Sequence, residues 1–279
     1  MTATPSATEA RVGGHPYVRA FGLDFPGPVG LGAGYDRTGE RLPELDRAGF
    51  GFVELGTVTP EPVDGHNPGV DALAAAVMRH RARRRPARPG PLIGINLGRQ
   101  PDHPLREAGC DFAIAMRSAW DCADYLAINL TGPAAQPLHA PERTLERVAV
   151  LEHVRQQQER LTAMTGRRTP VLLKYPIVLG APLDRALALR FDGLIAVFED
   201  AQDRSPVYAA QRDLARMAEA LRPSTTLVAG SGVRSAGDAA HCLAAGARLV
   251  QIHRAYLEHG DALIVRINQK LAAARRWYS

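Results

Sequence analysis

The stretch TPVLLKYPIV, residues 169–178, places a lysine inside an apolar run that has the length of one strand. A short, continuous apolar run between turn residues is typical of a strand buried on both faces. The lysine is Lys174, and Lys270 is the only other lysine among 34 lysine and arginine residues. An ammonium on such a strand loses hydration and needs an anionic partner, so Lys174 marks a candidate functional site.

Similar apolar runs recur along the chain, and segments with helical spacing lie between them. The eight runs cover residues 28–34, 51–58, 91–98, 124–132, 170–176, 192–199, 224–232 and 247–254. Alternation of strand and helix over about 250 residues predicts an α/β fold, a (β/α)8 TIM barrel, with a doubly wound sheet as the alternative. We expect a single barrel domain over residues 18–279, preceded by a flexible segment over residues 1–17.

The composition is that of a soluble globular protein. Of 279 residues, 46% are hydrophobic and 23% are charged, which suffices for a large core. Three widely spaced cysteines form no CxxC pair, so we expect neither a disulfide framework nor a metal site, and a cytoplasmic location. The sequence shows no apolar leader and no run long enough to cross a membrane.

A run of arginines, RHRARRRPARP at residues 79–89, lies on the predicted second helix and its exit. Because no aromatic residues are interleaved with the arginines, we interpret the run as a solvated face rather than a nucleic-acid site. The expected partner is therefore a small-molecule substrate, with no nucleic acid and no membrane. The sequence leaves a homodimer open.

In a barrel of this kind the chemistry lies at the C-terminal ends of the strands. Lys174 ends the fifth run, where three roles are open to it. It could stabilise the negative charge of a reduced flavin, form a Schiff base, or simply pair with a carboxylate such as Glu54.

The loops after the seventh and eighth runs suggest a phosphate site. Gly230, Ser231 and Gly232 would let backbone N–H groups approach an anion, and a helix begins near Ser235. His253 and Arg254 follow the eighth run and could add donors. A tight turn is the alternative explanation for the two glycines.

Two asparagines end the third and fourth runs. The amides of Asn96 and Asn129 offer both donors and acceptors, which suits the edge of a heterocycle, although each could instead cap the following loop. Thr57 at the end of the second run is open to the same two interpretations.

Together these motifs resemble the dihydroorotate dehydrogenase family, most closely its class 2 members. The resemblance runs from about residue 18 to about residue 262. It is carried by FGLDFPGPVGLGAGYDRTGE, GFGFVELGTVTPEP, PLIGINLGRQ, DYLAINLTGP, PVLLKYP and VAGSGVRSAGDAAHCLAAGARLVQIHRAYLEHG.

The resemblance implies FMN at the mouth of the barrel and a set of residues that hold it. Lys174 would lie at flavin N1, and Arg37 would contact the substrate in place of the family's lysine. Cofactor contacts are implied for Ala33, Gly34, Thr57, Asn96, Asn129, Lys174, Gly230, Ser231, Gly232, Gln251, His253 and Arg254.

The chain departs from the family pattern where the substrate should bind. Gly132 occupies the position of the serine or cysteine base, and Ala134 that of the following asparagine. The Asn-Arg-Met-Gly-Phe loop after the second run is missing. The sixth run ends in residues 198–200, Phe-Glu-Asp, instead of an Asn-Thr pair, and one glycine-rich phosphate segment is absent. Only about 20 residues precede FGLDFPGPVGLGAGYDRTGE, which resembles the family's opening strand, so we do not expect coupling to a membrane quinone.

Three functions are consistent with this pattern. The first is an FMN-dependent oxidoreductase acting on a small substrate other than dihydroorotate. The second is a flavin-free barrel that serves as a scaffold or partner protein, and the third is a Schiff-base enzyme using Lys174. The catalytic acid or base is not identified, and the candidates are Tyr35, Tyr175, His139, Glu199 and Asp200. Thr131 is set aside because neighbouring side chains on a strand point to opposite faces.

Overall fold

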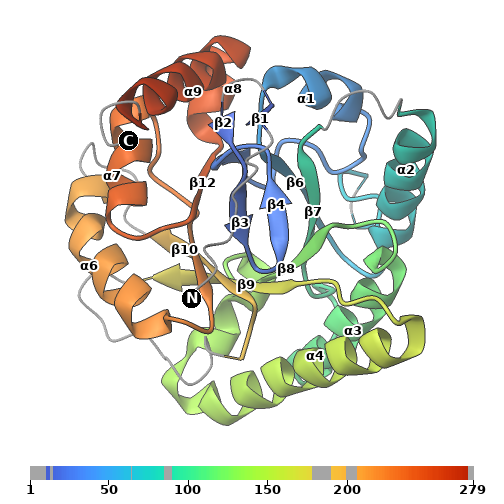
Figure 1. The fold of residues 1–279 in the computed structure, drawn as a ribbon. Coiled ribbons are helices and arrows are strands. Elements are labelled where there is room, and N and C mark those ends of the chain that lie inside the picture. The colour runs from blue at the N-terminus through green and yellow to red at the C-terminus, as the bar shows by residue number, and fades with distance from the viewer. Residues whose placement is uncertain are drawn as a thin grey trace, which may run out of the picture.

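Eight parallel strands close into a barrel, as the sequence predicts (Figure 1). The computed structural model describes residues 11–12, 15–63, 65–84, 90–177, 190–198 and 206–275. Neighbouring strands follow chain order, and β12 pairs with β5 to complete the ring. The strands are β5 (Val29–Leu31), β6 (Phe52–Val58), β7 (Leu92–Leu97), β8 (Tyr125–Asn129), β9 (Val171–Ile177), β10 (Gly193–Phe198), β11 (Thr226–Ala229) and β12 (Leu249–Ile252).

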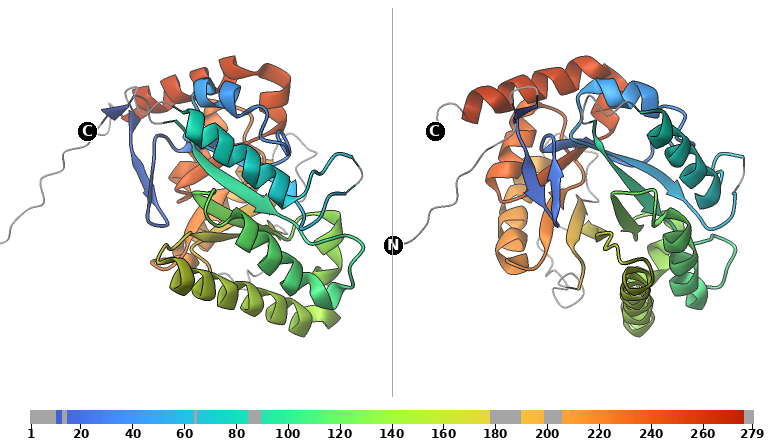
Figure 2. Two further views of the ribbon diagram at one scale, coloured as in Figure 1. Left: turned by 90° about the vertical axis from the view of Figure 1, so that its right-hand side faces the viewer. Right: turned by 45° about the vertical axis from the view of Figure 1, so that its right-hand side comes forward.

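Helices surround the barrel and cover the outer faces of its strands (Figure 2). The α-helices are α1 (Leu42–Ala48), α2 (Val70–Arg83), α3 (Ala108–Ala119), α4 (Thr144–Thr165), α6 (Pro206–Leu221), α7 (Ala236–Ala244), α8 (Arg254–His259) and α9 (Asp261–Arg275). Short 3-10 turns, η1 (Leu105–Glu107), η2 (Pro133–His139) and η3 (Pro141–Arg143), lie in the loops before α3 and α4. The helix expected near residues 183–191 lies mostly outside the described residues.

Alternation along each strand sends its side chains to two separate apolar clusters. Val53 and Leu55 of β6 face the helices, whereas Phe52 faces the inside of the barrel. The inner cluster is packed around Phe52 and Tyr125, whose ring centroids lie 6.3 Å apart. A Cβ on Gly94 would lie 2.1 Å from the Tyr125 ring, so only glycine admits the ring at that point.

An antiparallel hairpin, β3 (Val18–Ala20) and β4 (Leu23–Phe25), closes the N-terminal end of the barrel (Figure 1). Phe25 is fully buried and packs edge-on against Phe52, with centroids 5.5 Å apart. Phe21 contacts Tyr125 at 5.6 Å. The sequence did not reveal this hairpin. It begins the predicted barrel domain, with the short pair β1 (Arg11–Val12) and β2 (His15–Pro16) before it. The flexibility proposed for residues 1–17 stays a prediction.

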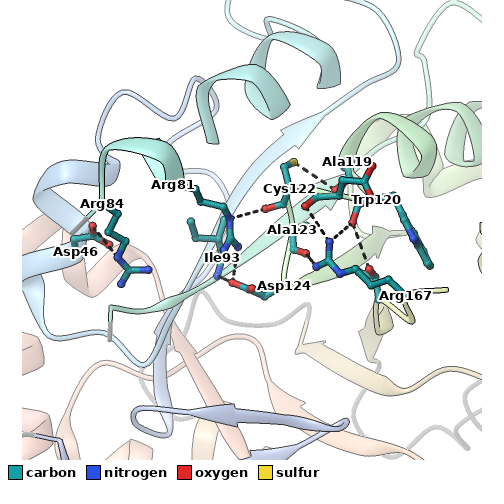
Figure 3. Close-up of polar contacts among 12 residues, drawn as sticks. Asp46, Arg81, Arg84, Ile93, Ala119, Trp120, Cys122, Ala123, Asp124 and Arg167 are labelled. Atoms are coloured by element: carbon teal, nitrogen blue, oxygen red, sulfur yellow. Dashed lines mark hydrogen bonds and ion pairs between the residues drawn. The ribbon is translucent and has the colours of Figure 1, made fainter. Parts of the chain in front are cut away.

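Arginines hold the turns at the N-terminal edge of the barrel (Figure 3). The Asp124 carboxylate accepts hydrogen bonds from Arg81 Nη2 at 2.8 Å and from the Ile93 N–H at 2.7 Å. Arg81 Nε donates to the Cys122 carbonyl, and Arg167 donates to the carbonyls of residues 120, 121 and 123. Arg81 belongs to the run interpreted as a solvated face, so that interpretation is wrong for this residue.

Among the described residues, none of the helices is both long enough and apolar enough to cross a lipid bilayer.

Replacing Asp124 with alanine should destabilise the fold. The change leaves the Ile93 N–H and one Arg81 nitrogen without their acceptor, and we expect the free energy of unfolding to fall by about 1–3 kcal/mol. Urea denaturation followed by circular dichroism would measure the loss. The neighbouring exposed Asp121→Ala is the control and should change stability little. Equal stabilities of the two variants would contradict the anchoring role of Asp124.

Candidate functional site

A cavity of about 450 Å³ lies at the C-terminal ends of the strands. Residues on β6, β8, β9, β10 and β12 and in the loops after β5, β8, β11 and β12 form its wall. They are Gly32, Ala33, Thr57, Asn129, Thr131, Lys174, Val197, Gly230, Ser231, Gly232, Val233, Arg234, Gln251, His253, Arg254 and Ala255. The position is the one that a TIM barrel uses for its chemistry.

A second hollow of about 490 Å³ lies on the outside of the barrel between α1 and α2. Arginine side chains from α2 and Asp46 from α1 line it, and no strand contributes to it. Because chemistry in this fold depends on groups at the strand ends, we place the candidate site in the cavity at the strand ends rather than in this hollow.

A buried carboxylate organises the floor of the cavity. Glu54 of β6 is 1% exposed and lies one layer above the Phe52 ring. Its oxygens accept hydrogen bonds at 2.8 Å each from Lys174 Nζ on β9, Asn96 Nδ2 on β7 and Gln251 Nε2 on β12. A buried charge of this kind is tolerated only when it is paired and hydrogen-bonded, and Glu54 is both. The ion pair with a carboxylate that the sequence left open for Lys174 is therefore present.

The charge on Glu54 also affects Tyr125 below it. The Tyr125 hydroxyl lies 3.4 Å from Glu54 Oε2, a long contact. Burial, followed by the negative charge of Glu54, holds the pKa of Tyr125 well above its ordinary value. Tyr125 therefore stays neutral and can donate to the carboxylate.

A chain of hydrogen bonds runs from Glu54 to the cavity wall. Asn96 Oδ1 accepts from the Thr57 hydroxyl at 2.7 Å, and Thr57 Oγ1 accepts from Asn129 Nδ2 at 2.9 Å. Asn129 Oδ1 then accepts from both the backbone N–H and the hydroxyl of Thr131. Asn96 is fully buried beneath the wall, so it supports Thr57 and Asn129, which line the cavity.

The end of the cavity formed by the loops after β11 and β12 carries positive charge. Arg234 and Arg254 line this end, together with the Gly230–Gly232 turn. The Arg234 guanidinium also lies 3.7 Å from the Glu258 carboxylate, which offsets part of its charge. The Ser231 hydroxyl accepts from the Phe198 N–H at 2.8 Å, which ties the turn to the end of β10. Backbone N–H groups and guanidinium groups together are suited to an anion such as a phosphate.

Two wall residues have buried polar atoms without a hydrogen-bond partner in the described part of the chain. They are His253 Nε2 and Gln251 Oε1. The His253 ring faces Gly34, where an added Cβ would lie 3.0 Å from Nε2. Burial, followed by the charges of Lys174 and Arg254, lowers the pKa of His253. Unpaired buried polar atoms in a cavity wall are costly unless a ligand or water satisfies them.

The candidate acids and bases within the described residues, Tyr35, Tyr175 and His139, do not line the cavity. The Tyr35 hydroxyl donates to Glu44 at 2.7 Å and contacts Arg41, and burial raises the pKa of Tyr35. His139 Nε2 lies 2.7 Å from the Leu130 carbonyl, and the His139 ring packs edge-on against Tyr175.

The remaining predicted positions lie outside the cavity wall or outside the described residues. Tyr175 packs into the cluster that faces the helices, as alternation from Lys174 requires. Arg37 is exposed and Gly34 lies behind His253. Glu199 and Asp200 lie outside the described residues.

Sequence reasoning missed six residues of the wall and was wrong about one polar member, Thr131. The six are Gly32, Thr131, Val197, Val233, Arg234 and Ala255. Thr131 was set aside because it neighbours Gly132 on an extended strand, yet β8 ends at Asn129 and the alternation ends with it. Arg234 was not singled out, although it stands two residues after Gly232. A charged residue two positions after the predicted phosphate turn was the sequence signal that could have identified Arg234.

Comparison with known proteins places the chain in a family. The dihydroorotate dehydrogenase (quinone) of Xanthomonas oryzae pv. oryzae is 35% identical over an alignment of 288 positions, which covers 88% of this chain and 80% of the relative. This chain belongs to the dihydroorotate dehydrogenase family. The Flavobacterium lutescens dihydroorotate dehydrogenase (quinone) is 33% identical and covers the same share of the chain and 81% of its own length. No family model matches the chain.

Solved structures of dihydroorotate dehydrogenase share the fold. Ligand-free dihydroorotate dehydrogenase from Eimeria tenella superposes with a TM-score of 0.78 at 21% identity, over 96% of this chain and 89% of that one. The same enzyme in complex with ferulenol gives 0.75 at 22% identity, over 91% and 83%. The barrel architecture is therefore that of dihydroorotate dehydrogenase.

His253 should make the folded protein sensitive to acid. Its pKa is lowered in the folded state, whereas an unfolded histidine titrates near about 6.5. As the pH falls through that value, the unfolded chain binds a proton that the folded chain does not, so stability is lost. The stability advantage of wild type over His253→Asn should shrink between pH 7.5 and pH 5.5 in urea denaturation. An advantage that is constant with pH would contradict the buried, neutral imidazole.

Proposed function

We propose that the protein is an FMN-dependent oxidoreductase that acts on a small substrate other than dihydroorotate. The observation that carries the proposal is that Lys174 Nζ, fixed at 2.8 Å from Glu54, also lines a cavity with unsatisfied polar atoms at the mouth of the barrel. Membership in the dihydroorotate dehydrogenase family supports the redox class.

The cavity suits FMN in size and in the arrangement of its polar groups. About 450 Å³ falls within the range of about 300–1,000 Å³ that is usual for small-molecule sites. The floor offers Lys174 and the free Gln251 Oε1, which suit the polar edge of a flavin ring. The opposite end offers Arg234 and Arg254 for a phosphate. These guanidiniums would stand in for the glycine-rich segment that the family resemblance implies and this chain lacks.

The bound cofactor would accept a hydride from the substrate, and the residues of this chain would hold both molecules in place. Lys174 would present its charge to the cofactor from a position fixed by Glu54. The Thr57 and Asn129 side chains would keep their orientation because each already has a partner within the chain. Rigid groups of this kind need no reorganisation when charge develops on a ligand.

The β8 loop supports a change of substrate. Gly132 stands where the family resemblance implies the base, and glycine has no side chain to take a proton. Thr131 in the wall donates its hydroxyl hydrogen to Asn129, which leaves oxygen lone pairs available to a ligand. The Arg99 side chain donates to the carbonyl of Ala134, so the position of the missing asparagine is held through its backbone and offers no polar side chain. The loop therefore offers acceptors rather than an activated base.

One observation favours the flavin-free scaffold as a second candidate. Glu54 neutralises Lys174 within the chain, so the floor is electrostatically satisfied without any ligand. The same ion pair weighs against the Schiff-base alternative, because an amine bound to a carboxylate must leave it before attacking a carbonyl.

The purified protein should be yellow, and Lys174→Ala should bind FMN at least about tenfold more weakly because one charge-assisted contact is lost. Absorbance near the flavin bands and the release of FMN on denaturation measure this. Lys270→Ala, at the exposed other lysine, is the matched control and should bind FMN as wild type does. Colourless wild type that does not take up added FMN would favour the scaffold, and tight binding by folded Lys174→Ala would refute the lysine's role.

Dihydroorotate should not reduce the bound flavin, because no side chain at residue 132 can take its proton. In an anaerobic cuvette the flavin band should persist with excess dihydroorotate and disappear with dithionite. A Cβ at residue 132 would lie 3.6 Å from Asn129 Nδ2, an ordinary contact distance, so the Gly132→Ser variant should fold. The variant shows whether a hydroxyl at this position restores the reaction with dihydroorotate. Rapid bleaching of the wild-type flavin by dihydroorotate would refute the change of substrate.

A further inference from the structure

We infer that Glu54 sets the redox potential of the cofactor site by neutralising Lys174 from below. The inference rests on the proposed function, since it requires FMN in the cavity. Glu54 is not part of the cavity wall, so it acts through Lys174 and is a positioning residue.

Glu54 is held in a fixed position as the counter-ion of Lys174. Its side chain is fully buried, whereas the Lys174 side chain is about 10% exposed and reaches the cavity. Asn96 and Gln251 each donate to it at 2.8 Å, so the carboxylate keeps its place even if Lys174 moves.

The pair therefore presents little net charge to the cavity. Glu54 and Lys174 contribute −1 and +1, so their sum is zero. A reduced flavin carries negative charge near the group that a lysine contacts, and stabilising that charge raises the potential. Because Glu54 partly neutralises it, Lys174 would orient the flavin and donate a hydrogen bond to it. It would attract the negative charge of the reduced flavin less strongly than an unpaired ammonium would. Glu54 thus keeps the cofactor a stronger reductant than Lys174 alone would make it.

Wild type, the two single variants and the double variant give four proteins with three charge states of the pair in one cavity. Glu54→Gln leaves the pair with +1 and Lys174→Met leaves it with −1. The double variant returns the pair to zero, as in wild type. His253, Arg254 and Arg234 line the same cavity and are unchanged throughout, so differences between the variants report on the pair.

The order of the potentials is the test. In FMN-loaded protein, the two-electron potential of Glu54→Gln should be higher than that of wild type, and that of Lys174→Met should be lower. The double variant should return close to wild type. A tenfold preference for reduced over oxidised FMN, gained on removing Glu54, corresponds to a rise of about 30 mV. Dye-coupled reductive titration measures all four potentials and does not depend on knowing the substrate.

A matched control separates this role from a general effect of removing a buried carboxylate. Asp111 is also 1% exposed and is bound by His103 and the Gln100 N–H, but it lies outside the cavity wall. Asp111→Asn should leave the potential unchanged even if stability falls. If one single variant unfolds, the other single variant must still shift the potential in its stated direction and the double variant must still return it to wild type.

The outcomes separate the inference from the function on which it rests. Wild type that binds no FMN overturns both. Bound FMN with an unchanged or lower potential in Glu54→Gln overturns the role of Glu54 and leaves the proposed function standing. A double variant whose potential departs from wild type as far as either single variant also overturns it, because charge neutralisation then fails to describe the pair.

Discussion

The buried ion pair between Glu54 and Lys174 is the constraint on which the mouth of the barrel depends. The two residues are 120 positions apart and meet only because β6 and β9 belong to one closed ring. Without the ring, neither charge could leave water, since each would carry a desolvation cost on the order of several kcal/mol with no partner. Asn96 and Gln251 complete the arrangement from two further strands, so four strands are tied at one carboxylate.

The side chains above this carboxylate are oriented by a chain of hydrogen bonds. The chain runs from Asn96 to Thr57, from Thr57 to Asn129 and from Asn129 to Thr131, and each bond fixes which end of the next amide or hydroxyl donates. Below it, the aromatic rings of Phe52 and Tyr125 fill the barrel and exclude water from the base of the pair. The apolar layer and the polar layer are thus mutually dependent, because the low polarity beneath the carboxylate strengthens the bonds above it.

The sequence predicted the barrel because its eight runs each carry the signal of a strand buried on both faces. It also named Glu54 as one possible carboxylate partner for Lys174, while leaving a flavin contact and a Schiff base open. The β3–β4 hairpin escaped prediction because strands of three residues leave too short a pattern, and what stabilises them is contact with Phe52 and Tyr125 far along the chain. Thr131 was misjudged because the end of a strand depends on its neighbours, and alternation holds only as far as pairing does. Asn96 lies in the layer below the cavity, whereas Asn129 lies in its wall. Both motifs end in Ile-Asn, so the sequence does not show how deeply each asparagine is buried.

The hairpin that seals one end of the barrel has a kinetic consequence. With Phe25 wedged against Phe52 and no exposure to solvent, nothing can approach Lys174 from that side. If the site transfers electrons in two halves, donor and acceptor must both approach from the C-terminal ends of the strands, where the cavity of about 450 Å³ lies. If they occupy that cavity in turn, the steady-state rates would show the parallel double-reciprocal lines of a ping-pong scheme.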